Sequence, residues 1–557
     1  MSSTIFGLFR QADEEDPLSN GKSLAAWLQR QPNNDFLALQ EAIVRLLEDF
    51  AARRPKITPT RVLVVMELDQ VAASIQMRLM AQYLQPTLSE KVRQRLWHAA
   101  DDVARWFAYV YEQLFEGLQD FFLSMKAKGL LPGVASRMFH YRGIQAMQGL
   151  FHYERWIPRR WNMLHAAYEV TEARGCAGVP FALFADRPAA EGYSAEEEFL
   201  QILLLQRVNT GNLTPLEIER CAAWLRSWIH GLMLSRPPLE GPGFWLDLGQ
   251  GEGLLVRKPE KTLGALLYLD VAPLLKKIDD AMIDLSVQLR AVGAKPVESE
   301  VNERLQLLQR LQDLLCVETK QKTRRGERVG TDRPVHVAVS LPGIASMLRS
   351  AKTTPAAQAL APAAHRPGSG AAIPPDPRAA KQAVTIEFQS DEPQSWYMYD
   401  YSDSGCRLVS SSPVGAGHRL GALMGVQEQG DSRWRIAIVR RLKRFSGGRA
   451  ELGVEVIAQH AVLIVPKPAT GRDSGYRVTG VKLSIEDKSF DALYLPPTQS
   501  DLYLPQRTMV VPASEYFEHR RCALTVDGYA CTVEFTAPNE QNKDWVWTTF
   551  EVVRNAG

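Results

Sequence analysis

Two short stretches far apart in the chain decide how its C-terminal half is interpreted: RRGER at 324–328 and DYSDSG at 400–405. Arginine side chains carry planar, permanently charged forks that bind phosphates with paired hydrogen bonds and stack on purine rings. An Asp/Ser/Gly turn at a strand end offers acceptors and hydroxyls for a base edge, and its glycine allows a close backbone approach. Together the two stretches suit a ligand that is both a purine and a diphosphate.

The pairing resembles the PilZ family, the bacterial receptor domain for cyclic di-GMP. Members carry an RxxxR motif on the segment that enters a small β-barrel and a [D/N]xSxxG motif on the barrel wall. Here Arg324 and Arg328 match the first motif, and Asp400, Ser402 and Gly405 match the second. The resemblance implies a PilZ-like β-barrel with cyclic di-GMP as its ligand.

The resemblance extends beyond these motifs and covers roughly 318–460. At 434–457, WRIAIVRRLKRFSGGRAELGVEVI predicts two strands around a Gly-Gly turn and ends in the Gly-Val-Glu that PilZ barrels often show. Two features depart from the family pattern. The motifs lie further apart than usual, and the extra residues Gly330–Asp332 separate Arg328 from the predicted strand Val335–Ser340.

The resemblance also implies what the arginines do. Arg324 and Arg328 would hold ligand phosphates and lie against guanine faces, and Arg325 would assist them. Without the resemblance, a charge run such as RRGER is a solvated basic turn between a helix and a strand. The presence of DYSDSG in the expected place favours the ligand-binding interpretation.

The second motif receives its roles in the same way. Asp400 would accept hydrogen bonds from the N1 and N2 edge of a guanine. Ser402 would contact a base or a phosphate, and Gly405 would shape the turn. The alternative is that Asp400 and Ser402 only stabilise a β-turn.

Length, composition and charge predict a multidomain cytoplasmic protein. A chain of 557 residues is long enough for about three or four domains. A net charge of +2 argues against a dedicated DNA or RNA binder, which would usually be strongly basic. The six cysteines are scattered without a CxxC motif, which indicates reduced cytosolic thiols.

The sequence shows neither a leader nor a membrane span. The stretch MSSTIFGLFRQADEED at 1–16 lacks the charged region and apolar run of a signal peptide. No apolar stretch reaches the ~18 residues that a bilayer requires. We therefore expect a soluble, cytoplasmic protein.

From 36 to about 235 the apolar residues follow a helical period. Thr87–Glu90, Ser194–Glu197 and Thr214–Glu217 are capping boxes, in which each side chain satisfies a backbone donor of the other residue. The turn-rich GLLPG at 129–133 predicts a connection between helices. We expect residues 1–297 to form an all-α domain, either a bundle or an irregular solenoid.

The stretch GFWLDLGQGEGLLV at 243–256 interrupts this pattern, and its alternation around Gly-Gln-Gly predicts a β-hairpin. It also resembles the glycine-rich first motif of S-adenosylmethionine methyltransferases, whose glycine turn must lead directly into a helix beneath the cofactor. Pro259 forbids a continuing helix here, and no alternating strands and helices follow. The hairpin is therefore the favoured interpretation.

A connecting amphipathic helix is predicted at 298–323. It carries an apolar seam formed by Val301, Leu305, Leu308, Leu311 and Leu315. We favour packing of this seam on the helical domain, because two or three heptads are few for a coiled coil. The alternative is pairing with a second copy in a homodimer.

Residues 354–383 are dominated by Ala and Pro and contain no Phe, Tyr or Trp. Such a segment cannot bury enough apolar area to offset its ordering entropy. We expect a flexible insert within the PilZ-like barrel, between a first strand at 335–340 and the strand AVTIEFQ at 383–389. The insert explains the long gap between the motifs.

After 383 the apolar period is two, which predicts strands. We assign 324–460 to the PilZ-like barrel. Six further strand-like stretches at 461–557, spaced by about ten residues, predict a second small barrel or sandwich. The predicted fold class is multidomain α+β: an N-terminal all-α domain followed by two small antiparallel β-barrels, the first PilZ-like.

No catalytic constellation emerges from the sequence. There is no GxSxG, HExxH or Walker A motif. The histidines of the FHY triplets at 139–141 and 151–153 do not share a helix face, so a metal pair is not expected. We predict no enzymatic activity, no cofactor and no metal.

We interpret the chain as a cytoplasmic cyclic di-GMP receptor in which the barrel senses the nucleotide and the helical domain binds an unidentified protein partner. The runner-up is a non-enzymatic scaffold whose barrel no longer binds nucleotide, motivated by the lengthened spacing after Arg328. A methyltransferase is the third class.

Overall fold

The computed structural model describes residues 16–553 apart from 33, 86–87, 120–124, 155, 183, 185–192, 209–210, 237–241, 292–294, 318–328, 354–393, 403, 416, 446, 470–487, 498–506 and 527–528. The chain divides into two compact units, residues 1–323 and 324–557. Each unit is described by itself.

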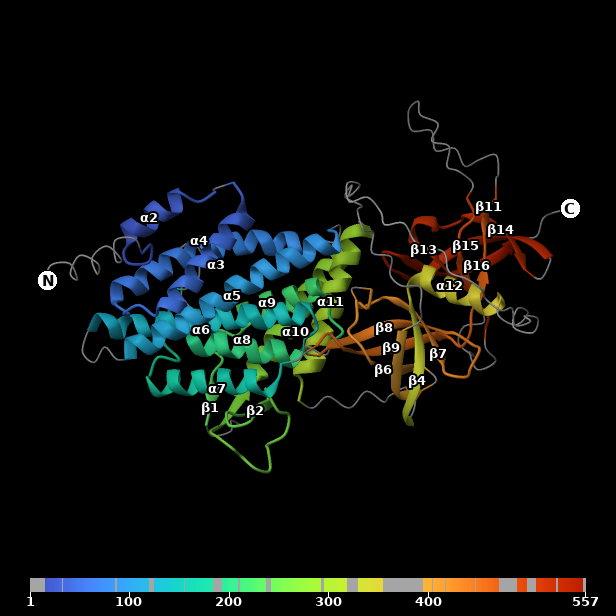
Figure 1. Cartoon of the computed structure of the whole chain (residues 1–557). Helices are drawn as coiled ribbons and strands as arrows, with labels where there is room; N and C mark the ends of the chain where they lie inside the picture. The colour runs from blue at the N-terminus through green and yellow to red at the C-terminus, as the bar shows by residue number, and fades with distance from the viewer. Residues whose placement is uncertain are drawn as a thin grey trace, which may run out of the picture. The chain divides into compact units, whose positions relative to one another are not determined.

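The first unit is helical and carries one small antiparallel sheet (Figure 1). Its elements are α2 (Gly21–Gln29), α3 (Phe36–Arg53), α4 (Pro59–Tyr83), α5 (Glu90–Gln119), α6 (Met125–Phe151), α7 (Pro158–Ala173), α8 (Ala195–Val208), α9 (Pro215–Trp228), β1 (Leu234–Ser235), β2 (Gly243–Asp247), β3 (Leu266–Asp270), α10 (Ala272–Ala291) and α11 (Lys295–Leu315). None of the helices in the described part of the chain has the length and hydropathy that a bilayer span requires.

One hydrophobic core runs from α2 to α11. α5 packs against α3, α4 and α6, and α8 packs against α6, α9 and α11. Leu308, Leu311 and Leu315 of α11 are at most 2% exposed and belong to this core. The apolar seam is therefore used within the unit, as the core-packing interpretation predicts.

Two of the three predicted capping boxes are present, and the third includes Thr87, which lies outside the described residues. The backbone N–H of Ser194 donates to Glu197 Oε2 over 2.9 Å, and the N–H of Glu197 donates to Ser194 Oγ over 3.2 Å. Thr214 and Glu217 form the same reciprocal pair at the start of α9. These boxes satisfy backbone donors that a helix start leaves without partners.

The connection predicted at 129–133 is wrong, because α6 continues through it with Pro132 inside the helix. Gly133 lies where a Cβ atom would stand 2.6 Å from the ring of Phe181. The glycine thus allows a close contact with a neighbouring segment and does not end the helix. Tertiary packing here overrides the local preference of Gly and Pro for turns.

A buried polar network joins α4, α5 and α6 around Asp69, which has no exposed side-chain surface. The hydroxyl of Tyr111 donates to Asp69 Oδ2 over 2.6 Å, Arg137 Nη1 donates to the same oxygen over 2.7 Å, and Tyr141 donates to Oδ1. Buried charges are stable only when paired and hydrogen-bonded, and here one arginine and two phenols satisfy the carboxylate.

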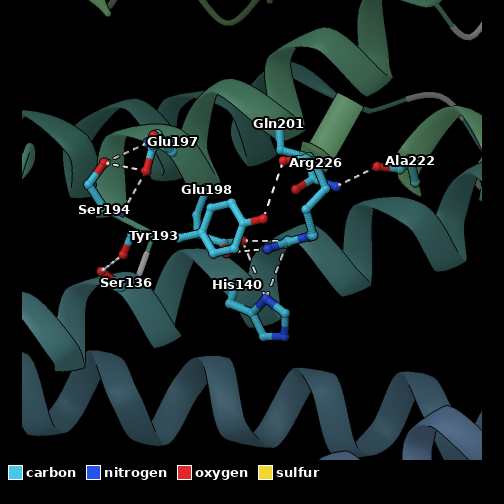
Figure 2. A network of polar contacts seen from close by, with 9 residues as sticks. All are labelled: Ser136, His140, Tyr193, Ser194, Glu197, Glu198, Gln201, Ala222 and Arg226. Carbon is cyan, nitrogen blue, oxygen red and sulfur yellow. Dashed lines mark hydrogen bonds and ion pairs between the residues drawn. The ribbon is translucent and has the colours of Figure 1, made fainter. Parts of the chain in front are cut away.

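Figure 2 shows a second buried network, around Glu198 of α8. Arg226 of α9 donates to both carboxylate oxygens, over 2.6 and 2.8 Å, and His140 Nδ1 lies 3.3 Å from Oε2. Tyr193 lies beside the pair, and its ring is 5.1 Å from the Arg226 guanidinium carbon. Burial alone would raise the pKa of Glu198, but Arg226 and His140 lower it to about 2. This histidine of the first FHY triplet is therefore part of a helix-packing network.

The strand pair predicted at 243–256 differs from the observed one. β2 pairs with β3, which lies beyond residue 265, and only a single bridge joins Trp245 to Leu255. The intervening loop is held by Asp247, whose carboxylate accepts backbone N–H groups of Leu263 and Gly264 over 2.8 and 2.9 Å. A long loop fixed by one carboxylate replaces the expected tight turn.

The second unit contains a closed antiparallel barrel of strand order β4-β5-β6-β9-β8-β7 (Figure 1). The barrel strands are β4 (Val329–Val339), β5 (Gln394–Ser402), β6 (Gly405–Ser410), β7 (Leu423–Glu428), β8 (Arg435–Arg444) and β9 (Ala450–Ala458). The predicted strand at 383–389 and the predicted insert at 354–383 lie outside the described residues.

A seven-stranded antiparallel sheet of order β10-β12-β13-β16-β15-β14-β11 follows the barrel. Its strands are β10 (Val462–Ile464), β11 (Lys467–Pro468), β12 (Ala492–Leu495), β13 (Thr508–Pro512), β14 (Arg521–Val526), β15 (Tyr529–Gln541) and β16 (Trp545–Val553). The helix α12 (Ser340–Thr353) contacts both barrel and sheet strands. The predicted fold class, an all-α region followed by two antiparallel β regions, is confirmed.

Candidate functional site

The DYSDSG segment forms the hairpin between β5 and β6. Ser402 ends β5 and pairs with Gly405, the first residue of β6. The hydroxyl of Ser402 donates to the carbonyl oxygen of Gly405 over 3.2 Å. The Ser of the motif thus closes the turn, and its backbone partner is the Gly of the same motif.

Gly405 is required by a close approach of β6 to β9. A Cβ atom on this residue would stand 2.4 Å from the carbonyl oxygen of Val454. Real Cβ atoms do not come so close to a backbone oxygen, so any larger residue would push the two strands apart. Gly405 therefore allows β6, and with it the β5–β6 hairpin, to pair closely with β9 in the barrel wall.

A β-bulge turns Asp400 to the outer face of the barrel. Met398 pairs with Leu408 and both are fully buried, whereas Asp400 pairs with Arg407, whose side chain is 42% exposed. The extra residue, Tyr399, shifts the register between these pairs. In a regular strand Asp400 would share the buried face of Met398, two residues earlier. Bulges re-aim side chains in this way.

The Asp400 carboxylate forms an ion pair with Arg407, with 2.9 Å between Oδ2 and Nε. The Asp400 side chain is 15% exposed and that of Arg407 is 42% exposed, so the ion pair lies at the protein surface with its carboxylate mostly covered. A carboxylate in this position offers hydrogen-bond acceptors to a ligand edge.

Arg324, Arg325 and Arg328 lie outside the described residues. The residue that follows Arg328 is described: Val329 opens β4 and pairs with Tyr401. The chain therefore enters the barrel beside the second motif.

The residues Gly330–Asp332 do not form the separate spacer that the sequence suggested. β4 begins at Val329, Gly330 pairs with Asp400, and a register shift accommodates the extra residues before Arg333. The first barrel strand is thus longer at its start than predicted, because a bulge lets extra residues join the ladder.

Sequence reasoning missed two exposed arginine–tyrosine contacts beside the hairpin. The guanidinium of Arg333 lies 5.6 Å from the ring centre of Tyr401, and that of Arg407 lies 5.7 Å from Tyr399. Arg333 also forms an ion pair with Glu428 over 2.9 Å. The alternating aromatics of WYMYDY could have indicated an outer aromatic row, but only the bulge fixes which residues face outward.

The glycine-rich stretch at 243–256 is structural. Burial alone would raise the pKa of Asp247, but hydrogen bonds from the backbone of Leu263, Gly249 and Gly264 lower it. A Cβ on Gly251 would meet Pro158 at 2.5 Å. No helix begins at these glycines, as a methyltransferase would require. In the described part of the chain, no cluster of metal-binding side chains occurs.

Comparison with protein families gives two matches. Residues 22–238 match the model described as "Cyclic-di-GMP receptor FimW, N-terminal domain", and residues 351–462 match "Cyclic-di-GMP receptor FimW, middle PilZ domain". The resemblance inferred from sequence covered only the C-terminal half, so the N-terminal match extends it. No curated protein matches the chain. The chain is thus similar, in order, to the N-terminal domain and to the middle PilZ domain of the FimW family of cyclic-di-GMP receptors.

Proposed function

We propose that the chain is a cytoplasmic receptor that binds cyclic di-GMP between its arginine stretch at 324–328 and the outer wall of its β-barrel. Arg324 and Arg328, assisted by Arg325, hold the phosphates and lie against the guanines. The hairpin of Asp400, Ser402 and Gly405 receives a guanine edge.

The strand register of β4 and β5 carries this proposal. Val329 and Gly330, which follow the arginines, pair with Tyr401 and Asp400. Two stretches about seventy residues apart in sequence are therefore joined by one ladder of backbone hydrogen bonds. This supports a single ligand touching both motifs, with charge-assisted hydrogen bonds from arginine to phosphate as the strong contacts.

Calorimetric titration of the full chain with cyclic di-GMP tests the proposal. We expect saturable binding, and Asp400→Ala should weaken it by about tenfold or more because hydrogen bonds to a charged acceptor are lost. The variant should stay folded, since the partner Arg407 is 42% exposed and remains solvated. Arg433→Ala is the control: this arginine pairs with Asp431 in the loop before β8. Unchanged binding by Asp400→Ala, or an equal loss of binding in the control, would contradict the proposal.

Coupling to a protein partner through the helical unit is the second part of the proposal. A ligand shifts a conformational equilibrium only as far as its affinity differs between the two states. Hydrogen exchange of residues 16–317 with and without saturating cyclic di-GMP tests this step. Unchanged exchange throughout the helical unit would restrict the receptor to local binding.

One observation favours a scaffold whose barrel does not bind nucleotide. Asp400 already has a cationic partner in Arg407, so a guanine must compete with an existing ion pair. Arg407 is 42% exposed, and ion pairs at the protein surface contribute about 0–1 kcal/mol, so a ligand can displace this one. A titration without heat and without competition at tens of micromolar would favour the scaffold.

A further inference from the structure

The outer face of the barrel carries a row of paired residues that extends beyond the two motifs. Asp400 pairs with Gly330 on one side and with Arg407 on the other. Arg407 pairs with Gly453 of β9, and Gly453 pairs with Arg441 of β8. Directly paired residues of antiparallel strands share one face of the sheet, so these five residues form one continuous outer row.

Two positions of this row are glycines, Gly330 and Gly453, so no side chain projects from the sheet there. A Cβ on Gly330 would meet nothing within 4 Å. A Cβ on Gly453 would stand 3.2 Å from Arg441 Cβ and 3.7 Å from Arg441 Cγ and Cδ. The stem of Arg441 therefore leans over Gly453, in the direction of β6 and the Asp400–Arg407 pair.

The guanidinium of Arg441 has no acidic partner among the described residues. The other arginines of the six barrel strands have partners: Arg333 and Arg435 pair with Glu428, Arg407 with Asp400, Arg440 with Glu455 and Glu540, and Arg444 with backbone carbonyls. Arg441 is exposed, and its side chain forms no ion pair or hydrogen bond with the described residues.

The acidic side chains nearest to Arg441 in the ladder are already occupied. Glu451 lies 3.4 Å from Lys443 Nζ, and Glu455 accepts from Arg440 over 2.7 Å. Their positive partners leave Arg441 as an uncompensated cation. An uncompensated guanidinium at the end of a row that begins at a guanine-binding carboxylate suits a phosphate.

We propose that Arg441 is a further ligand-binding residue, which contacts a phosphate of the cyclic dinucleotide whose guanine edge lies at Asp400. This inference rests on the proposed function. The row spans three strand spacings from β5 to β8, about 14 Å between backbones at a spacing of about 4.8 Å. Arg441 shortens this distance by lying across Gly453, so one dinucleotide can reach both ends.

The test is titration of the full chain with cyclic di-GMP at low and high salt. Arg441→Ala should weaken affinity by about tenfold, and the loss should shrink at high salt because screening weakens the phosphate contact. Arg441→Lys should keep part of the affinity, since a point charge replaces a two-pronged donor. Lys443→Ala is the matched control, two residues along the same strand but already paired with Glu451.

Gly453→Ala gives an independent measurement, because its added methyl group must displace the Arg441 stem. It should weaken binding in the wild-type background and have little further effect in Arg441→Ala, as expected of two residues acting through one contact. If Arg441→Ala binds cyclic di-GMP as tightly as the wild type while Asp400→Ala loses binding, the assignment of Arg441 is overturned and the proposed function stands. Absence of binding by the wild-type chain overturns the proposed function itself and this inference with it.

Discussion

At the scale of single residues, one inserted tyrosine determines whether the barrel can offer a carboxylate to a ligand. Alternation in WYMYDY would place Trp396, Met398 and Asp400 on the same face. The bulge at Tyr399 moves Asp400 to the outside. The motif indicates which residue types could contact a ligand. The bulge at Tyr399, however, depends on how β5 pairs with β6, and no local sequence pattern encodes that pairing. The sequence therefore proposes which residues form the candidate site, but it does not predict how Asp400 comes to face outward.

The same substitution should affect stability differently at the two glycines of the site, Gly405 and Gly330. Gly405→Ala should destabilise the second unit by about 1–3 kcal/mol, as overpacked sites do, because its Cβ would stand 2.4 Å from a carbonyl oxygen. Gly330→Ala, with open space around its Cβ, should be nearly neutral. Chemical denaturation of both variants measures the difference. Equal stability would contradict the close approach of β6 to β9.

A buried histidine makes the stability of the second unit depend on pH. Burial lowers the pKa of His418 from 6.5 to about 4, against a hydrogen bond to the Gly415 carbonyl. Between these two pH values His418 is protonated in the unfolded chain and neutral in the folded one. The free energy of unfolding therefore decreases as pH falls from about 6.5 towards about 4. Urea unfolding at several pH values should show a shallower decline for His418→Gln. Parallel curves for the two proteins would exclude this role.

At the scale of elements, local signals predicted helix starts better than helix interiors. The boxes at Ser194 and Thr214 involve residues three apart, so sequence alone contains the whole interaction. GLLPG was misassigned because Gly133 serves contact with Phe181, nearly fifty residues away. The helix α12 was not predicted at all, since its place between two β regions depends on tertiary contacts.

The Glu198 network predicts a large effect of removing one partner. Arg226→Ala leaves a carboxylate that is 1% exposed without its two-pronged donor, which should cost about 3–5 kcal/mol. Arg236→Ala breaks a pair with Glu172 in which the arginine is 60% exposed, and should cost about 0–1 kcal/mol. Thermal unfolding of the two variants measures the contrast. A small loss for Arg226→Ala would mean that the network does not hold α8 and α9 together.

At the scale of the whole molecule, the period of the apolar residues predicted that a helical region precedes the β regions. It did not predict how the two β regions pack together. Barrel and sheet were predicted as separate, at 324–460 and 461–557. In the structure Leu423, Trp434, Leu493 and Trp545 belong to one core that α12 also joins. Contacts between residues so far apart in the chain leave no local pattern.

This shared core predicts that the barrel does not stand alone. A chain ending at residue 460 would expose Leu423, Trp434 and Ile436, which are at most 3% exposed in the full chain. Exposed apolar patches of this kind promote aggregation. The truncated chain should be less soluble and should melt at a lower temperature than the full chain. A soluble barrel with an unchanged melting temperature would show that the sheet contributes nothing to its stability.

The central claim is that two distant stretches hold one ligand, and a double-mutant cycle between Arg328 and Asp400 tests it most directly. Cyclic di-GMP affinity is measured by calorimetry for the wild type, Arg328→Ala, Asp400→Ala and the double variant. Residues that grip one ligand should be coupled by about 0.5–3 kcal/mol, so the double variant loses less than the sum of the single losses. Strictly additive losses, or a wild-type chain that does not bind cyclic di-GMP, would contradict the claim.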